Sequence, residues 1–201
     1  MKTSERLVNI AFGFSILYWG VAGFLAYNEG LNTPFIRFFI TLLNLTVGFL
    51  ILFRKPVIKS GSLKAVLYSL PSLVCGGLIF KLALPLNQWS LVSELLFTLG
   101  ASMALLSFLM LGRNFSIFPG LRSVVSGGFY KIVRHPSFLG ESLMLTGCLM
   151  AADGWLSLIP FLLFIPTIAL RIKEEESLLL YDQGYLEYTR QVRWRLIPGV
   201  W

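Results

Sequence analysis

Long apolar runs alternate with short polar links along this chain. Four runs are each close to the roughly 20 residues that an α-helix needs to cross a bilayer, namely Leu7–Tyr27, Phe35–Phe53, Ala65–Leu84 and Ser90–Leu111. Two shorter runs of 17 and 16 residues follow a polar interval, Pro136–Ala152 and Trp155–Leu170. Because these two only just reach across a bilayer, we interpret them as a tilted helical hairpin. The pattern predicts an all-α integral membrane protein with about five to six transmembrane helices.

The polar intervals mark where these helices end. Asn28-Glu29-Gly30 ends the first run. The longest interval, Gly112–Lys131, contains several glycines and a proline, which predicts a loop that is too polar for lipid. The tail, Arg171–Trp201, carries leucines and tyrosines on a helical period, so we predict a helix through about Arg190 that Gly184 weakens or breaks. The chain therefore divides into a four-span region and a second region, residues 1–112 and 113–201.

Composition agrees with a membrane protein and indicates its orientation. Hydrophobic residues make up 56% of the chain and charged residues only 13%, about half of their share in a soluble domain. With six crossings, 15 of the 17 lysines and arginines fall on one side of the membrane, and Arg37 and Lys81 are the exceptions. The positive-inside rule then places both termini and the Gly112–Lys131 loop in the cytoplasm. We expect the inner membrane in a prokaryote and the endoplasmic reticulum in a eukaryote.

The same features argue against two other kinds of site. The net charge of +7 comes mostly from residues between apolar segments, so it predicts membrane orientation rather than nucleic-acid binding. Cys75 and Cys148 lie inside apolar runs, and His135 is the only histidine. These residues give no evidence of a disulfide and are too few for an ordinary zinc site, so no metal is expected.

Two polar clusters lie beside the hairpin arms, on the side where the cations gather. The first contains Tyr130, Arg134, His135 and Glu141, and the second contains Arg171, Glu174, Glu175 and Glu176. Ordinary alternatives exist for most of these residues: a plain helix ion pair, a solvated acidic face, or a polar histidine at the membrane edge. Together they predict a mixed-charge pocket at the membrane surface without naming a reaction.

The spacing within the clusters suggests how they are built. Arg171 and Glu175 are four residues apart and share a helix face. Glu141 lies in an apolar helix and needs a partner, which Arg134 supplies if that helix extends back past Pro136. His135 precedes this proline, so we expect it at a helix start with backbone N–H groups free to bind a carboxylate or phosphate.

The first cluster lies in a recognisable motif. Gly128-Phe129-Tyr130-Lys131-Ile132-Val133-Arg134-His135-Pro136-Ser137-Phe138-Leu139-Gly140 resembles the signature G-x-Y-x-x-V-R-H-P-x-Y-x-G, with Phe138 where tyrosine is usual. This is the signature of the isoprenylcysteine carboxyl methyltransferases and the related membrane phospholipid methyltransferases. The tail resembles the same family at Arg171, Glu175, Glu176, Leu179, Gly184, Tyr185 and Tyr188.

The resemblance implies that residues 113–201 are a methyltransferase-like catalytic region that binds S-adenosyl-L-methionine. In agreement, no strand followed by G-x-G-x-x-G occurs, so a Rossmann domain is not expected. The tail would complete the cofactor pocket on the cytosolic side. The residues that the family pattern assigns to the cofactor are Gly128, Tyr130, Val133, Arg134, His135, Pro136, Gly140, Glu141, Glu175 and Glu176. Those that it assigns to catalysis are Arg171, Glu175 and Glu176.

The methyl acceptor that the resemblance implies is lipophilic or lipidated, most like the carboxyl group of an isoprenylated cysteine. A carboxylate is already ionised at neutral pH, and Arg171 would hold it bidentately. A lipid amine and a small thiol are alternatives that need deprotonation, for which a nearby glutamate would serve. An NADPH-dependent reductase of the sterol type and a non-enzymatic membrane protein are two further alternatives.

Overall fold

The computed structural model describes residues 3–25 and 34–201, which contain helices at every apolar run. The α-helices are α1 (Thr3–Leu25), α2 (Pro34–Phe53), α3 (Leu63–Leu82), α4 (Leu91–Leu111), α5 (Pro136–Met150), α6 (Leu158–Leu179) and α7 (Gln183–Gln191). Short 3-10 turns lie between them: η1 (Leu86–Gln88), η2 (Gly112–Asn114), η3 (Gly128–Lys131) and η4 (Trp155–Ser157). The predicted turn at Asn28-Glu29-Gly30 lies outside the described residues.

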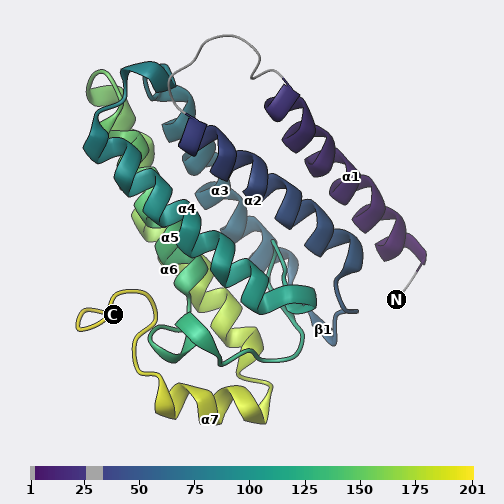
Figure 1. The fold of residues 1–201 in the computed structure, drawn as a ribbon. Coiled ribbons are helices and arrows are strands. Elements are labelled where there is room, and N and C mark those ends of the chain that lie inside the picture. Colours follow the sequence, from purple (N-terminus) through teal and green to yellow (C-terminus); the bar gives the residue numbers. More distant parts are fainter. Residues whose placement is uncertain (1–2, 26–33) are drawn as a thin grey trace.

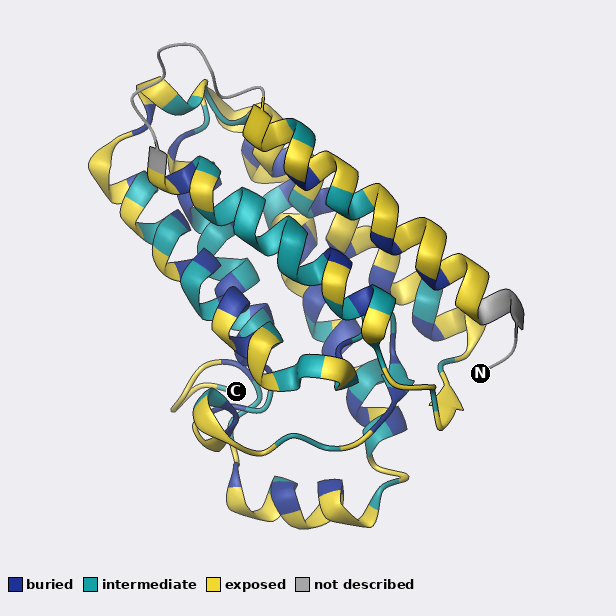
Figure 2. Cartoon of the chain, turned by 45° about the vertical axis from the view of Figure 1, so that its right-hand side comes forward, coloured by how far each residue is buried: buried dark blue, intermediate teal, exposed yellow. Residues whose placement is uncertain are grey.

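Five of the described helices are long and apolar enough to cross a membrane, which confirms the coarse prediction of an all-α membrane protein. They are α1, α2, α3, α4 and α6. The exception is α5, whose 15 residues make it about 22 Å long against a hydrocarbon core of about 30 Å. Large apolar side chains such as Trp19 (68% exposed) and Leu162 (62% exposed) lie on the outer faces. Figure 2 shows these exposed faces in yellow, where a bilayer would cover them.

Helices α1 to α6 alternate in direction, so that three separate segments meet at one end of the bundle (Figure 1). These segments are residues 54–62, 112–135 and 180–201, and we call this the polar end. Two of them form a short antiparallel ladder, β1 (Lys59–Ser60) with β2 (Gly120–Leu121). Lys55 also donates its backbone N–H to the Arg113 carbonyl at 2.7 Å. Because α5 leads away from this end and α6 returns to it, His135 and Arg171 lie at the same end.

The two arms of the predicted hairpin pack mainly against other helices. Helix α5 lies along α4, and α6 lies along α3. Helices α4 and α5 approach closely because glycines meet: a Cβ on Gly140 would lie 2.6 Å from the Gly100 carbonyl oxygen and 2.7 Å from the Ala104 nitrogen. Because no side chain separates the two backbones at this crossing, the glycines determine how α5 is positioned along α4.

We expected the second hairpin arm to end at Leu170 and the tail to begin at Arg171. In the structure no boundary lies there, because α6 continues without a break through Leu179. The predicted helix to Arg190 is instead interrupted after Leu179, and α7 begins afresh. Asp182 caps α7, since its side chain accepts the Tyr185 N–H at 3.3 Å. The break lets α7 cross beneath the bundle at the polar end (Figure 1).

We expect Gly140→Ala to destabilise the protein by about 1–3 kcal/mol, because the new methyl group meets backbone atoms of α4 that cannot move independently. Gly77→Ala is the matched control, since a Cβ on Gly77, also in a membrane helix, meets nothing within 4 Å. The measurement is the thermal unfolding midpoint in mild detergent. Equal midpoints for the two variants would contradict the close helix crossing.

Candidate functional site

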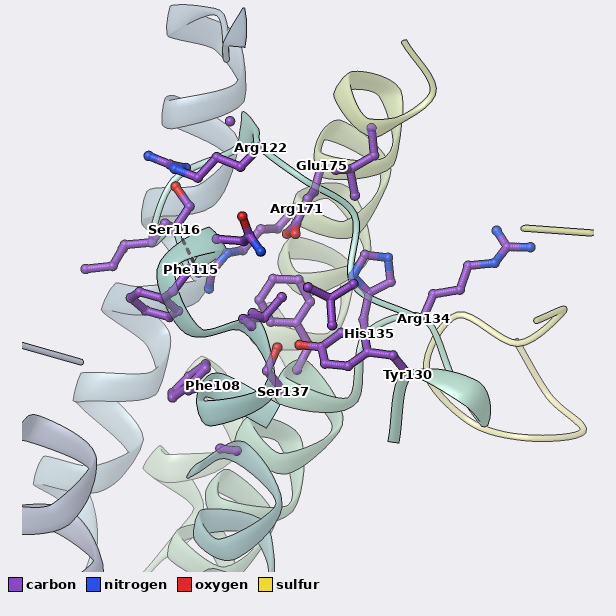
Figure 3. Close-up of a pocket in the computed structure, with 18 of the residues that line it drawn as sticks. Phe108, Phe115, Ser116, Arg122, Tyr130, Arg134, His135, Ser137, Arg171 and Glu175 are labelled. Atoms are coloured by element: carbon purple, nitrogen blue, oxygen red, sulfur yellow. Dashed lines mark hydrogen bonds between the residues drawn. The ribbon is translucent and has the colours of Figure 1, made fainter. Parts of the chain in front are cut away.

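A cavity of about 330 Å³ lies at the polar end (Figure 3). This is within the range of roughly 300–1,000 Å³ that small-molecule sites occupy. The two polar clusters predicted from the sequence meet on its wall, which includes Tyr130, Arg134, His135, Glu141, Arg171 and Glu175. The remainder of the wall comes from α2, α3, α4 and the loop that follows α4.

The Glu176 carboxylate holds the two clusters together from behind this wall. Its Oε1 accepts from Arg134 Nη1 at 3.0 Å and lies 3.4 Å from His135 Nε2. Its Oε2 accepts from Arg195 Nε at 2.7 Å. The Tyr185 hydroxyl donates to Oε1 at 3.3 Å. Since Glu176 is only 5% exposed, these donors replace the water that the carboxylate loses on folding.

The segment 192–201 closes this arrangement with backbone hydrogen bonds. The N–H groups of Arg134 and His135 donate to the carbonyls of Trp194 and Arg195, both at 2.9 Å. Arg134 also donates from Nε to the Val192 carbonyl at 2.8 Å. The His135 N–H, at the start of α5, is therefore engaged by the tail. The His135 ring stacks on the Phe138 ring, with the ring centroids 5.6 Å apart.

Arg171 pairs with Glu141 and not with Glu175, which shares its helix face. Its Nη1 lies 3.5 Å from Glu141 Oε2, and its guanidinium lies over the Phe138 ring, 4.6 Å from the centroid. It also donates to Ser72 Oγ at 3.3 Å and to the Ile117 carbonyl at 3.0 Å. Glu141 therefore pairs with Arg171 rather than with Arg134, which binds Glu176.

Three tyrosines make the floor of the cavity. The Tyr188 hydroxyl donates to the Tyr130 carbonyl at 2.6 Å, which ties α7 to η3. The Tyr130 hydroxyl donates to the Ser107 carbonyl at 3.4 Å and points toward the Ser137 side chain (Figure 3). Burial raises the pKa of Tyr130 and of Tyr185 above the ordinary value for tyrosine, and nearby glutamates raise both further. Both hydroxyls therefore stay protonated at neutral pH and act as donors.

Two hydrogen-bond acceptors of the wall have no hydrogen bond among the described residues. Within the described part of the chain, the Glu175 carboxylate has neither a hydrogen bond nor an ion pair. The Asn114 Oδ1 atom is buried and has no hydrogen-bond partner. The arginines of the wall, in contrast, already donate to protein oxygens: Arg134 and Arg171 as above, and Arg122 from Nε to the Lys55 carbonyl at 2.9 Å.

Five residues that the family pattern assigns to the cofactor do not line the cavity: Gly128, Val133, Pro136, Gly140 and Glu176. Val133 and Pro136 are buried, and Gly140 lies in the α4–α5 crossing. Gly128 has a φ of +59°, which favours glycine at the start of η3. Their assignment to a cofactor stays a prediction. The structure places them in the surrounding fold rather than on the cavity wall.

Other wall residues were not expected from the sequence. They include Phe108, Asn114, Phe115, Ser116 and Arg122, at the end of α4 and in the following loop. This loop has no periodic pattern and lies outside the quoted motif. Its turn residues Gly112, Asn114 and Pro119 predicted a loop but gave no sign of a place on the cavity wall.

Comparisons with protein-family models, with curated proteins and with solved structures found no match.

Replacing Glu176 by glutamine should destabilise the protein by about 3–5 kcal/mol, because the buried Arg134 loses the charge that compensates its desolvation. Glu174→Gln is the matched control two residues away. Its partner Lys64 is exposed and 3.9 Å distant, so the expected loss is at most about 1 kcal/mol. Chemical unfolding in detergent measures both, and a Glu176→Gln variant as stable as the control would refute the buried ion pairs.

Proposed function

We propose that this protein is an integral membrane methyltransferase that uses S-adenosyl-L-methionine to methylate a lipophilic or lipidated acceptor. The observation that carries the proposal is the meeting of two motifs on one cavity. Tyr130 and His135 come from the first motif, and Arg171 and Glu175 come from the tail, yet all four lie on the same wall. The sequence resemblance rests on these same two motifs.

The charges of the wall fit a cationic cofactor. S-adenosyl-L-methionine carries a sulfonium, an ammonium and a carboxylate group, and Glu175 is an unengaged carboxylate that suits the two cationic groups. A nicotinamide dinucleotide brings several phosphate charges, which need cations or free N–H groups. The wall arginines Arg134 and Arg171 already hold carboxylates, at 3.0 and 3.5 Å. The unengaged Glu175 carboxylate therefore favours the cationic methyl donor over the polyanionic nicotinamide cofactor of the reductase alternative.

In this proposal the paired glutamates have different roles. Glu175 holds the cofactor's ammonium group or ribose hydroxyls from the wall. Glu176 does not touch the cofactor; it positions Arg134 and His135 through the contacts at 3.0 and 3.4 Å. His135, Phe138 and the tyrosines supply flat surfaces beside the cofactor.

Methyl transfer needs alignment and the exclusion of water more than it needs proton chemistry. When bound, the cofactor supplies an electrophilic methyl group. The chain supplies a partly enclosed cavity, one part of whose wall is apolar, with Leu43, Val47, Leu73 and Phe108. That apolar wall suits a lipophilic acceptor entering from the bilayer. By the positive-inside rule we place the polar end, and with it the cavity, at the cytoplasmic face.

We expect S-adenosylhomocysteine to bind purified protein saturably and Glu175→Gln to weaken that binding about tenfold, because a charge-assisted hydrogen bond is lost. Isothermal titration in detergent is the measurement, with NADPH as the parallel ligand. Unfolding midpoints of both forms serve as the control for folding. Folded protein that binds NADPH but not S-adenosylhomocysteine would favour the reductase, and folded protein that binds neither would favour a non-enzymatic role.

A further inference from the structure

The segment that follows α7, residues 192–201, turns back toward the membrane helices (Figures 1 and 2). Its level is fixed by Arg195. The His135 N–H donates to the Arg195 carbonyl at 2.9 Å, and Arg195 Nε donates to the Glu176 carboxylate at 2.7 Å. Since α5 begins directly after His135, the segment lies beside the first turn of α5, where the apolar bundle passes into the polar end.

Hydrogen bonds near the end of this segment fix which of its side chains face outward. The Leu196 N–H donates to the Trp201 carbonyl at 2.9 Å, and the Trp201 N–H donates to the Ile197 carbonyl at 3.1 Å. Gly199, with a φ of +82°, allows the tight turn between them. Leu196 is thereby buried in the core, while Ile197 and Val200 are left 45% and 75% exposed.

Unpaired cations accompany these apolar side chains. Lys131 and Arg193 are exposed, and neither has an ion pair among the described residues. They belong to two segments that are joined, because the Arg134 N–H donates to the Trp194 carbonyl at 2.9 Å. The chain has no acidic side chain after Glu187, so nothing acidic on this segment offsets the positive charge.

We call this patch the basic–apolar surface, and it consists of Lys131, Ile132, Arg193, Ile197 and Val200. Aliphatic side chains flanked by lysine and arginine, with tryptophan nearby, are typical of segments that lie in the head-group layer of a bilayer. In water the three aliphatic side chains would stay exposed, since Ile132 is also 56% exposed. The bilayer is the partner that matches both the charge and the level of this surface.

We propose that residues 193–201 lie in the head-group layer and that the basic–apolar surface binds anionic phospholipid. Ile197 and Val200 enter the boundary of the acyl chains, and Lys131 and Arg193 meet the lipid phosphates. Each cation near an anionic leaflet favours the bound position by about fivefold. The proposal does not depend on the methyltransferase function, because this surface lies outside the cavity.

Lipid on this surface acts on the cavity through the backbone of the bound segment. The segment supplies the carbonyls that accept the N–H groups of Arg134 and His135, and it supplies Arg195 to the Glu176 carboxylate. Anionic lipid that holds the segment therefore holds these wall contacts closed. In a neutral membrane the segment is held less firmly, and the same hydrogen bonds open more often.

The first test measures the depth of the segment with a nitroxide label on Val200→Cys, in nanodiscs that contain phosphatidylglycerol. We expect the label to be more accessible to oxygen, which dissolves in lipid, than to a water-soluble nickel chelate. The matched control is Gln183→Cys, an exposed position at the start of α7, where the nickel chelate should dominate. The wild type measures background labelling of the buried Cys75 and Cys148.

The second test compares discs of phosphatidylcholine alone with discs that also contain phosphatidylglycerol. Hydrogen–deuterium exchange at the Arg134 and His135 amides should be about fivefold slower or more in the anionic discs. Arg193→Gln should remove most of that difference, and it leaves in place the backbone carbonyl that accepts from Arg134. Lys81→Gln makes a similar change on an exposed cation near the opposite end of α3 and should leave the difference intact.

Each outcome decides for or against the proposal. A Val200 label as accessible to the nickel chelate as the Gln183 label would place the segment in water and overturn it. A Val200 label shielded from both reagents would indicate a protein contact and overturn it as well. If the label is in lipid but exchange at Arg134 and His135 is equal in both kinds of disc, binding of anionic lipid and its effect on the cavity wall are refuted.

Discussion

The buried Glu176 carboxylate is the interaction on which the polar end depends. It connects α6 to the start of α5 through Arg134 and His135, and to the segment after α7 through Arg195. A carboxylate with this little exposure is tolerable only because charged donors surround it. The energetic requirement forces residues that are far apart in sequence into one rigid unit. That unit is the back wall of the cavity.

Three successive glutamates on α6 illustrate how helix geometry separates roles. Neighbouring helical residues point about 100° apart, so they reach different surroundings. Glu174 faces Lys64 at the rim, Glu175 lies on the cavity wall, and Glu176 enters the buried ion-pair cluster. Because α6 runs unbroken from the membrane span into the polar end, the rigid helix fixes all three directions at once.

Hydropathy predicted the helices well because the bilayer imposes one simple requirement on each of them. Partner choice was harder, as Glu141 shows: Arg134 is near in sequence, but Arg171 is near in space. The β1–β2 ladder was missed because two-residue strands have no periodicity. Asn114 was missed for a similar reason, since only the folding of a loop against α2 and α3 gives it an apolar neighbourhood. The motifs marked the polar half of the cavity, and packing between distant helices made the other half.

The central claim is that the two motifs form one ligand-binding cavity at the polar end. Hydrogen–deuterium exchange with and without S-adenosylhomocysteine tests it most directly, because it locates binding without any mutation. The account predicts slower exchange in peptides covering Gly112–Ile117, Gly128–Lys131 and Gln183–Gln191, with α1 unchanged. Unchanged exchange at the polar end, or protection confined to the opposite end of the bundle, would contradict it.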